Sequence, residues 1–180
     1  SYGPRKEKLS VVSVELGDAL APCVLMTPAP AEEAGGQATV RNAVKSAKSR
    51  GCVAAISAPA DIRDYLPFGK KAMLIKEGEP VAGLDDKMRA ARAFVGKSED
   101  GSRLVFVVAK GAYGSGLTAA ECAQYLVAQV CDAGFELPDA SHAVLLFDEG
   151  RGLSPLVSTA SARPCPALFG IRAKSKKEED

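Results

Sequence analysis

A continuous apolar run from Leu104 to Val108 is the feature that most restricts how this chain can fold. A run without polar side chains is typical of a strand that is buried on both faces, so we place it in the centre of a sheet. Shorter apolar runs at 52–56 and 143–147 predict two more buried strands. The chain is therefore expected to build its core mainly from strands.

Other segments predict the rest of the sheet. Alternating or short apolar runs favour strands at 9–16, 23–26, 156–158 and 167–172. Glycine-containing turns predict two hairpins, one over 72–81 with its turn at 77–78 and one over 91–109 with its turn at 99–101. Residues 28–38 and 57–69 contain proline and glycine and are expected to be loops, as is the turn at 163–164.

Two segments have helical periodicity. Thr118 and Glu121 fit a capping box, and the apolar stripe behind them predicts a helix that runs to about Ala133 and stops at Gly134. Thr39 is expected to cap a second helix, whose apolar side would be Val40, Ala43, Val44 and Ala47 and whose solvated side would be Arg41, Lys45 and Lys48.

Together these elements predict an α+β fold: a mixed, largely antiparallel sheet with two main helices packed on it. The length of 180 residues suits a single domain. We expect residues 9–173 to form it, between a polar N-terminal tail at 1–8 and a charged C-terminal tail at 174–180.

Composition excludes several classes of function. With 47% hydrophobic and 25% charged residues the chain is globular, and its net charge of +1 offers no basic face for nucleic acid. No apolar window is long enough to span a bilayer, so we expect a soluble protein. The N-terminus has no apolar signal-type run, but a mature end left after processing would look the same, and the compartment stays open.

The five cysteines do not form a metal site. None belongs to a C-x-x-C pair and His142 is the only histidine, so we expect no zinc and no other cofactor. The odd count favours free, buried thiols, although a disulfide is not excluded by the spacing.

The best local site candidate is the loop from Asp148 to Ser154, where a buried strand ends in charged residues and glycines. Taken alone, the loop is better explained as a polar turn in which Arg151 pairs with a carboxylate. Glycines 111, 114 and 116 precede the capped helix, but their spacing matches no nucleotide-binding pattern, and a flexible turn explains them better.

The order of these pieces resembles the phosphodiester glycosidase family, which includes the enzyme that uncovers mannose 6-phosphate on lysosomal glycoproteins. The matching stretches run over most of residues 9–173. They are 53–57 with Asp61, 67–69, 75–78, 92–96, 115–118 with Glu121, and 145–154.

The signature loops depart from that family. Where the family has A-I-N-G-x-F-F-D, this chain has Ser57 in place of the asparagine and lacks the aromatics. Where the family has L-D-G-G-G-S, Asp148 is kept, but Glu149 and Arg151 are inserted among the glycines before Ser154. Bulk in a loop that usually presents bare backbone should fill or reshape the pocket.

The resemblance implies cleavage of a sugar–phosphate linkage if activity is retained. Arg92, with Arg151, would hold phosphate oxygens, Asp148 would assist water attack or stabilise an oxocarbenium-like centre, and Thr118 would shape the site. Ser57, Asp61, Glu149 and Ser154 would complete the substrate site.

Two functions follow from the same residues. One is an active hydrolase with a sugar-phosphate ligand. The other is a catalytically silent member of the fold, used as a binding module or as a subunit that contacts other protein subunits. The lost asparagine, the crowded glycine loop and the 6% aromatic content favour the silent version.

Overall fold

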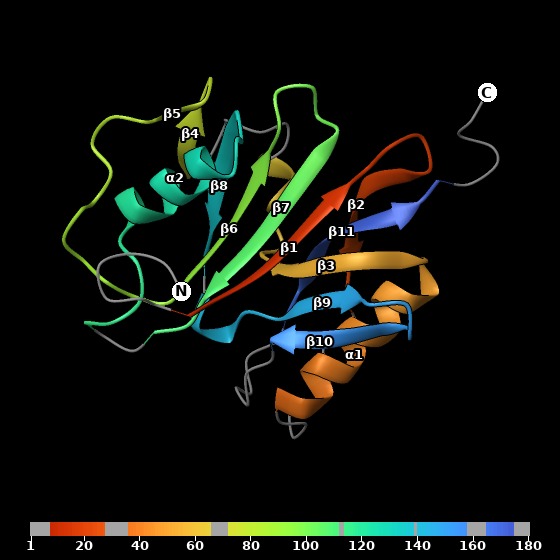
Figure 1. Ribbon diagram of the computed structural model, residues 1–180. Coiled ribbons are helices and arrows are strands. Elements are labelled where there is room, and N and C mark those ends of the chain that lie inside the picture. Colours follow the sequence, from red (N-terminus) through yellow and green to blue (C-terminus); the bar gives the residue numbers. More distant parts are fainter. Residues whose placement is uncertain are drawn as a thin grey trace. The chain divides into compact units, whose positions relative to one another are not determined.

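The computed structural model describes residues 8–27, 36–65, 72–111, 114–138, 140–157 and 165–174. The contacts within the chain divide it into two compact units. Unit 1 consists of residues 1–15 and 63–141, and unit 2 consists of residues 16–62 and 142–180. Each unit contains one antiparallel sheet and one α-helix (Figure 1).

Unit 1 has a six-stranded sheet in the order β1-β7-β6-β8-β4-β5, and all its pairs are antiparallel. Its strands are β1 (Leu9–Glu15), β4 (Met73–Lys76), β5 (Glu79–Pro80), β6 (Arg92–Lys97), β7 (Arg103–Ala109) and β8 (Ala133–Leu137). The predicted hairpins β4–β5 and β6–β7 are confirmed.

Strand β7 is an inner strand of this sheet, between β1 and β6. Every side chain from Leu104 to Ala109 is at most 2% exposed, although successive residues point to opposite faces. Both faces of β7 are therefore buried, which explains why the run has no polar residue.

Helix α2 (Ala119–Ala128) packs on the sheet of unit 1, where it contacts β4, β5, β6 and β8. Its buried stripe is Ala119, Cys122, Ala123 and Leu126, and the capping box of Thr118 and Glu121 is confirmed. Because the i and i+3 or i+4 positions share one side of a helix, this stripe faces the apolar cluster that contains Leu74, Ile75 and Phe94.

The predicted end of α2 is wrong. The helix stops at Ala128 and not near Ala133, and residues 133–137 form β8. Gly134 is a strand residue pressed against the helix: a Cβ there would lie 2.5 Å from Leu126 Cδ1 and 2.9 Å from Val95 O. Glycine is needed at this point because it lets a strand and a helix approach closely, which the sequence pattern cannot distinguish from a helix stop.

Unit 2 has a five-stranded antiparallel sheet in the order β10-β9-β3-β11-β2. Its strands are β2 (Leu20–Met26), β3 (Cys52–Ala58), β9 (Leu145–Asp148), β10 (Leu153–Val157) and β11 (Ala167–Ala173). The two edge strands carry Pro22 and Pro155. Proline has no amide hydrogen for a second neighbour, so it suits an edge and discourages further pairing there.

Helix α1 (Gly36–Ser49) packs on the sheet of unit 2, with Ala43 and Ala47 fully buried. Arg41, Lys45 and Lys48 are exposed, as predicted. The prediction that Thr39 caps this helix is wrong, because the helix begins three residues earlier, within the segment expected to be a loop. Thr39 is instead a buried position of the first turn.

The α+β fold class is confirmed, with the strands shared between two sheets and one helix on each. Two 3₁₀ turns, η1 (Ile62–Tyr65) and η2 (Ala140–His142), complete the described elements. The predicted turn at 163–164 lies outside the described residues, as does most of the 28–38 loop. All five cysteines are free and four are buried. In the described part of the chain, no helix has the length and apolar character to cross a membrane.

Replacing Leu126 by alanine tests how much of unit 1 depends on α2. Leu126 is fully buried against Gly96 and Gly134, so the free energy of unfolding should fall by about 2–5 kcal/mol. Val127→Ala is the matched control, because Val127 is 37% exposed and should change stability by less than about 0.5 kcal/mol. Urea unfolding measures both, and equal losses would contradict this packing.

Candidate functional site

Arg92, at the start of β6, is buried, and each of its three guanidinium nitrogens donates a hydrogen bond within the chain. Its side chain donates from Nε to the carbonyl of Leu117 (3.1 Å), from Nη1 to Glu136 Oε1 (2.6 Å) and from Nη2 to the carbonyl of Met88 (3.0 Å). The residue is 8% exposed. A buried guanidinium needs such partners because an unpaired charge is costly to remove from water.

Thr118 lies beside this arginine, at the N-terminus of α2. Its hydroxyl accepts from the amide of Glu121 (3.1 Å), and Glu121 Oε2 accepts from the amide of Thr118 (3.0 Å). Arg89 joins the group by pairing with Glu121 Oε1 and by donating to the carbonyl of Gly116 (2.6 Å). Two arginines therefore meet two carboxylates here, and the charges balance.

The loop before α2 is held by a close backbone approach. Gly116 has φ +88°, and a Cβ on it would lie 2.1 Å from the carbonyl oxygen of Ala90. Ala90 and Leu117 form a bridge with two hydrogen bonds of 3.2 and 3.1 Å. Gly116 thus helps to position the carbonyl of Leu117, which accepts a hydrogen bond from Arg92. Gly116 is needed for this close packing and not for flexibility.

Asp148 ends β9 in unit 2, and its carboxylate organises the turn to β10. Oδ1 accepts from the amides of Gly150 (2.8 Å) and Gly152 (2.9 Å), whose φ values are +88° and +94°. Glu149, Arg151 and Ser154 are exposed. The loop therefore contains a side-chain-capped hairpin turn, which agrees with its interpretation as a polar turn.

Ser57 is in the neighbouring strand β3, beside the opposite end of β9. Its hydroxyl accepts from the amide of Val144 (2.9 Å), and its own amide donates to the carbonyl of Val144 (2.8 Å). Val144 precedes β9 and Asp148 ends it. At about 3.3 Å per residue, Ser57 and Asp148 are roughly 13 Å apart along the strand.

The eight predicted site residues thus fall into three groups. Arg92 and Thr118 are together in unit 1. Asp148, Glu149, Arg151 and Ser154 share the β9–β10 hairpin of unit 2. Ser57 is at the opposite end of β9, and the exposed Asp61 follows it after β3. Within the described residues, no three His, Cys, Asp or Glu side chains are arranged to hold a metal ion.

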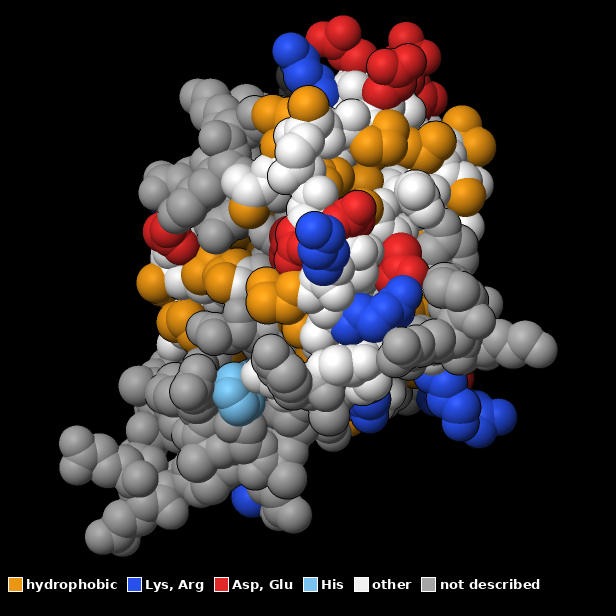
Figure 2. All heavy atoms as spheres, turned by 90° about the vertical axis from the view of Figure 1, so that its left-hand side faces the viewer, with side chains coloured by type: hydrophobic (Ala, Val, Ile, Leu, Met, Phe, Trp, Pro, Cys, Tyr) orange, Lys and Arg blue, Asp and Glu red, His pale blue; other side chains and the backbone are white. Residues whose placement is uncertain are grey.

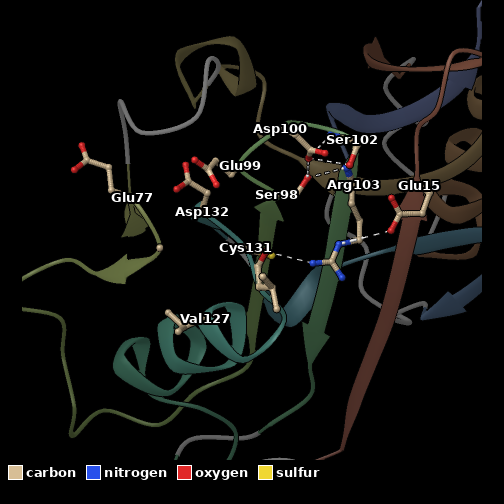
Figure 3. Close-up of a pocket in the computed structure, with 12 residues that line it drawn as sticks. Glu15, Glu77, Ser98, Glu99, Asp100, Ser102, Arg103, Val127, Cys131 and Asp132 are labelled. Carbon is tan, nitrogen blue, oxygen red and sulfur yellow. Dashed lines mark hydrogen bonds and ion pairs between the residues drawn. The ribbon is translucent and has the colours of Figure 1, made fainter.

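A hollow of about 810 Å³ in unit 1 was not predicted (Figure 3). We call it the acidic hollow, because five carboxylates and one arginine line it. It is bounded by the β4–β5 turn, the β6–β7 hairpin and the C-terminal end of α2. Its lining residues are Glu15, Glu77, Gly78, Ser98, Glu99, Asp100, Ser102, Arg103, Val127, Val130, Cys131 and Asp132.

Asp100 and Arg103 give the acidic hollow its shape. Asp100 Oδ1 accepts from the hydroxyls of Ser98 (2.6 Å) and Ser102 (2.8 Å) and from the amide of Ser102 (3.0 Å), and these bonds lower the pKa of Asp100 to about 2. Arg103 donates to the carbonyls of Gln129 and Val130, which directly follow α2. Its Nε also lies 3.8 Å from Glu15 Oε1. Its charge therefore favourably opposes the negative end of the helix dipole.

The sequence contained a partial signal for this hollow. Both acidic turns, at 77–78 and 99–101, were predicted as turns. Their meeting depends on β8, which lies between β6 and β4, and on the early end of α2. Both features were missed, so the two turns could not be brought together from sequence alone.

Comparison with known proteins identifies the family. The sequence model of the phosphodiester glycosidases matches residues 28–135, which is more than half of the chain. The chain belongs to the phosphodiester glycosidase family. The match includes Ser57, Arg92 and Thr118 and ends before β9 and the Asp148 hairpin.

One solved structure supports the fold, and a second is similar over part of the chain. The catalytic domain of zebrafish N-acetylglucosamine-1-phosphodiester alpha-N-acetylglucosaminidase, auto-inhibited by its pro-peptide, is 12% identical, with a TM-score of 0.55 over 92% of this chain and 88% of that one. A hypothetical protein from Synechocystis is 22% identical, with a TM-score of 0.45 over 59% of this chain and 21% of that one. Among curated proteins, none matches significantly.

Replacing Glu136 by glutamine tests the pair with Arg92. The amide keeps the size of the side chain but removes the counter-charge, so the free energy of unfolding should fall by about 2–4 kcal/mol. Glu77→Gln is the matched control, because the Glu77 side chain is 82% exposed and its pair with Lys76 should contribute little. If chemical unfolding shows the same stability for both variants, Glu136 does not carry the charge balance of this cluster.

Proposed function

We propose that this chain is a catalytically silent phosphodiester glycosidase-like domain that serves as a binding module in a larger assembly. The observation that carries the proposal is the state of Arg92. This is the residue that the family resemblance makes responsible for phosphate, and its guanidinium is bound to Glu136, Leu117 and Met88.

Charge balance strengthens the argument. A phosphodiester is an anion, and an arginine attracts it only when the arginine has positive charge to spare. Here Arg89 pairs with Glu121 and Arg92 pairs with Glu136. An incoming phosphate would have to displace a carboxylate from a side chain that is only 10% exposed and would then face that carboxylate's repulsion.

The Asp148 hairpin supports the same proposal. A general base needs an acceptor oxygen directed at its substrate. Asp148 Oδ1 instead accepts two amides of its own turn, and the glycines of that turn are interrupted by the exposed Glu149 and Arg151. The matched part of the family sequence also stops before this hairpin.

The acidic hollow is the surface that we propose for binding. Val130 and Val127 expose 76% and 37% of their area at its edge, beside Glu77, Glu99 and Asp132. Figure 2 views the side of the structure that carries α2 and β5 in Figure 1, and acidic side chains gather at one end of it next to exposed hydrophobic ones. Such a surface suits a protein segment with lysines or arginines around an apolar side chain.

The alternative is an active hydrolase that cleaves a sugar-1-phosphodiester linkage. Family membership and the fold shared with the zebrafish catalytic domain favour it. In that case Arg92 would have to leave Glu136 for the phosphate, while Asp148 would assist water attack from its turn. Thr118, Ser57 and Asp61 would then shape the substrate site with Ser154.

Hydrolysis of a panel of sugar-1-phosphodiesters by purified protein distinguishes the two functions. We expect no release of sugar above the buffer rate, because Arg92 is paired with Glu136 and Asp148 Oδ1 is held by its own turn. The zebrafish catalytic domain without its inhibiting pro-peptide is the positive control for the assay. Turnover that disappears in folded Asp148→Asn and Arg92→Lys variants would overturn the silent assignment and establish the hydrolase.

Binding to basic peptides tests the acidic hollow. A peptide with alternating lysine and leucine residues should bind the protein more tightly than an alternating glutamate and leucine peptide, with an affinity that falls as salt is raised. Glu99→Lys together with Asp132→Lys should weaken binding by about tenfold or more. Lys substitutions at Asp18 and Asp86, which do not line the hollow, are the control, and an equal loss there would exclude the hollow as the binding surface.

A further inference from the structure

Two thiols of unit 2 meet across a glycine. Cys23 is in β2 and Cys52 begins β3, and β11 pairs with both strands and runs between them. Their sulfur atoms are 3.8 Å apart. A Cβ on Gly170 of β11 would lie 3.3 Å from Cys52 Sγ and 3.4 Å from Cys23 Sγ. The missing side chain of Gly170 is therefore what allows the sulfurs to touch.

The backbone keeps this pair from closing into a disulfide. Adjacent strands are about 4.8 Å apart, so two strands separated by a third are roughly 10 Å apart. The Cα atoms of a disulfide are usually about 4.4–6.8 Å apart. Because β11 holds β2 and β3 on either side by continuous pairing, the two sulfurs meet as a thiol pair and not as a disulfide precursor.

The two thiols have different surroundings. Cys23 is on an edge strand and half-buried, whereas Cys52 is only 6% exposed. The hydrogen bond with Cys52 lowers the pKa of Cys23, and it outweighs burial, which raises this pKa; Arg172, the amide of Gly170 and Arg50 lower it further. The same bond, with burial, raises the pKa of Cys52. These surroundings therefore favour the thiolate at Cys23 and the hydrogen-bond donor at Cys52.

The other three cysteines are expected to be less reactive than Cys23. Burial raises the pKa of Cys131 and of Cys165 to about 11, and it also raises the pKa of Cys122. All three are at most 8% exposed. A thiolate is the reactive form of cysteine, so reactivity should concentrate at Cys23.

We infer that Cys23 is a nucleophilic thiol and a site of reversible S-thiolation by small disulfides such as oxidised glutathione, with Cys52 as the hydrogen-bond donor that positions it. The Cys23 thiolate attacks one sulfur of the small disulfide. A new sulfur–sulfur bond forms, the old one breaks, and its electron pair leaves on the departing thiolate, which is protonated by water. Cys52 keeps its proton, and excess reduced thiol reverses the reaction.

Mapping the adduct by mass spectrometry tests the site. The folded protein is incubated with oxidised glutathione, quenched with acid and digested. We expect one glutathionyl group per chain, on Cys23, and its removal by reduced glutathione. An adduct spread evenly over several cysteines, or a Cys23–Cys52 disulfide without glutathione, would overturn the inference.

The pH dependence of alkylation tests the role of Cys52. In Cys52→Ala the donor is lost, so the midpoint of Cys23 alkylation by iodoacetamide should move to higher pH, and the rate at pH 7 should fall about tenfold for each unit of pKa. Cys52→Ser keeps a hydroxyl donor and should retain the midpoint near that of the native protein. Circular dichroism confirms folding, and an unchanged midpoint in Cys52→Ala would refute the donor role.

Discussion

The pair between Arg92 and Glu136 is the interaction on which much of unit 1 depends. One guanidinium connects β6 to β8 through Glu136 and to the loop before α2 through Leu117. A buried charge with three partners fixes the positions of all of them, because losing any one leaves an uncompensated group. In the silent domain that we propose, the same contacts oppose phosphate binding, because a phosphate would have to displace Glu136 from the guanidinium.

Much of the fold could be predicted from local patterns. Apolar runs located β7, β3 and β9, and the Thr118–Glu121 box located the start of α2. The errors came where tertiary contacts override local preference. Gly134 was interpreted as a helix stop, but it belongs to a strand that passes close to Leu126, and Thr39 was interpreted as a cap although the helix starts at Gly36.

The candidate site was less predictable than the fold, because motif order does not determine which strand ends meet. Ser57 and Asp148 are both at strand ends, but β3 and β9 are antiparallel, so the two residues are at opposite ends of β9. The acidic hollow depends on the same kind of non-local information. Two turns that are far from each other in sequence line it only because β8 pairs with both β6 and β4.

Glycines mark the places where this chain differs most from what its sequence pattern indicates. At Gly116 and Gly134 the missing side chain allows backbone and helix to approach closely, and at Gly170 it allows two thiols to meet across a strand. At Gly150 and Gly152, by contrast, nothing lies within 4 Å of an added Cβ, and the positive φ alone requires glycine. The hairpin glycines thus allow the turn held by Asp148, whereas the buried glycines allow close contacts.

A substrate site at this hairpin would need open space beside backbone that carries no side chains. That space is present here, and the turn fixes the orientation of the Asp148 carboxylate beside it through the two hydrogen bonds of Oδ1.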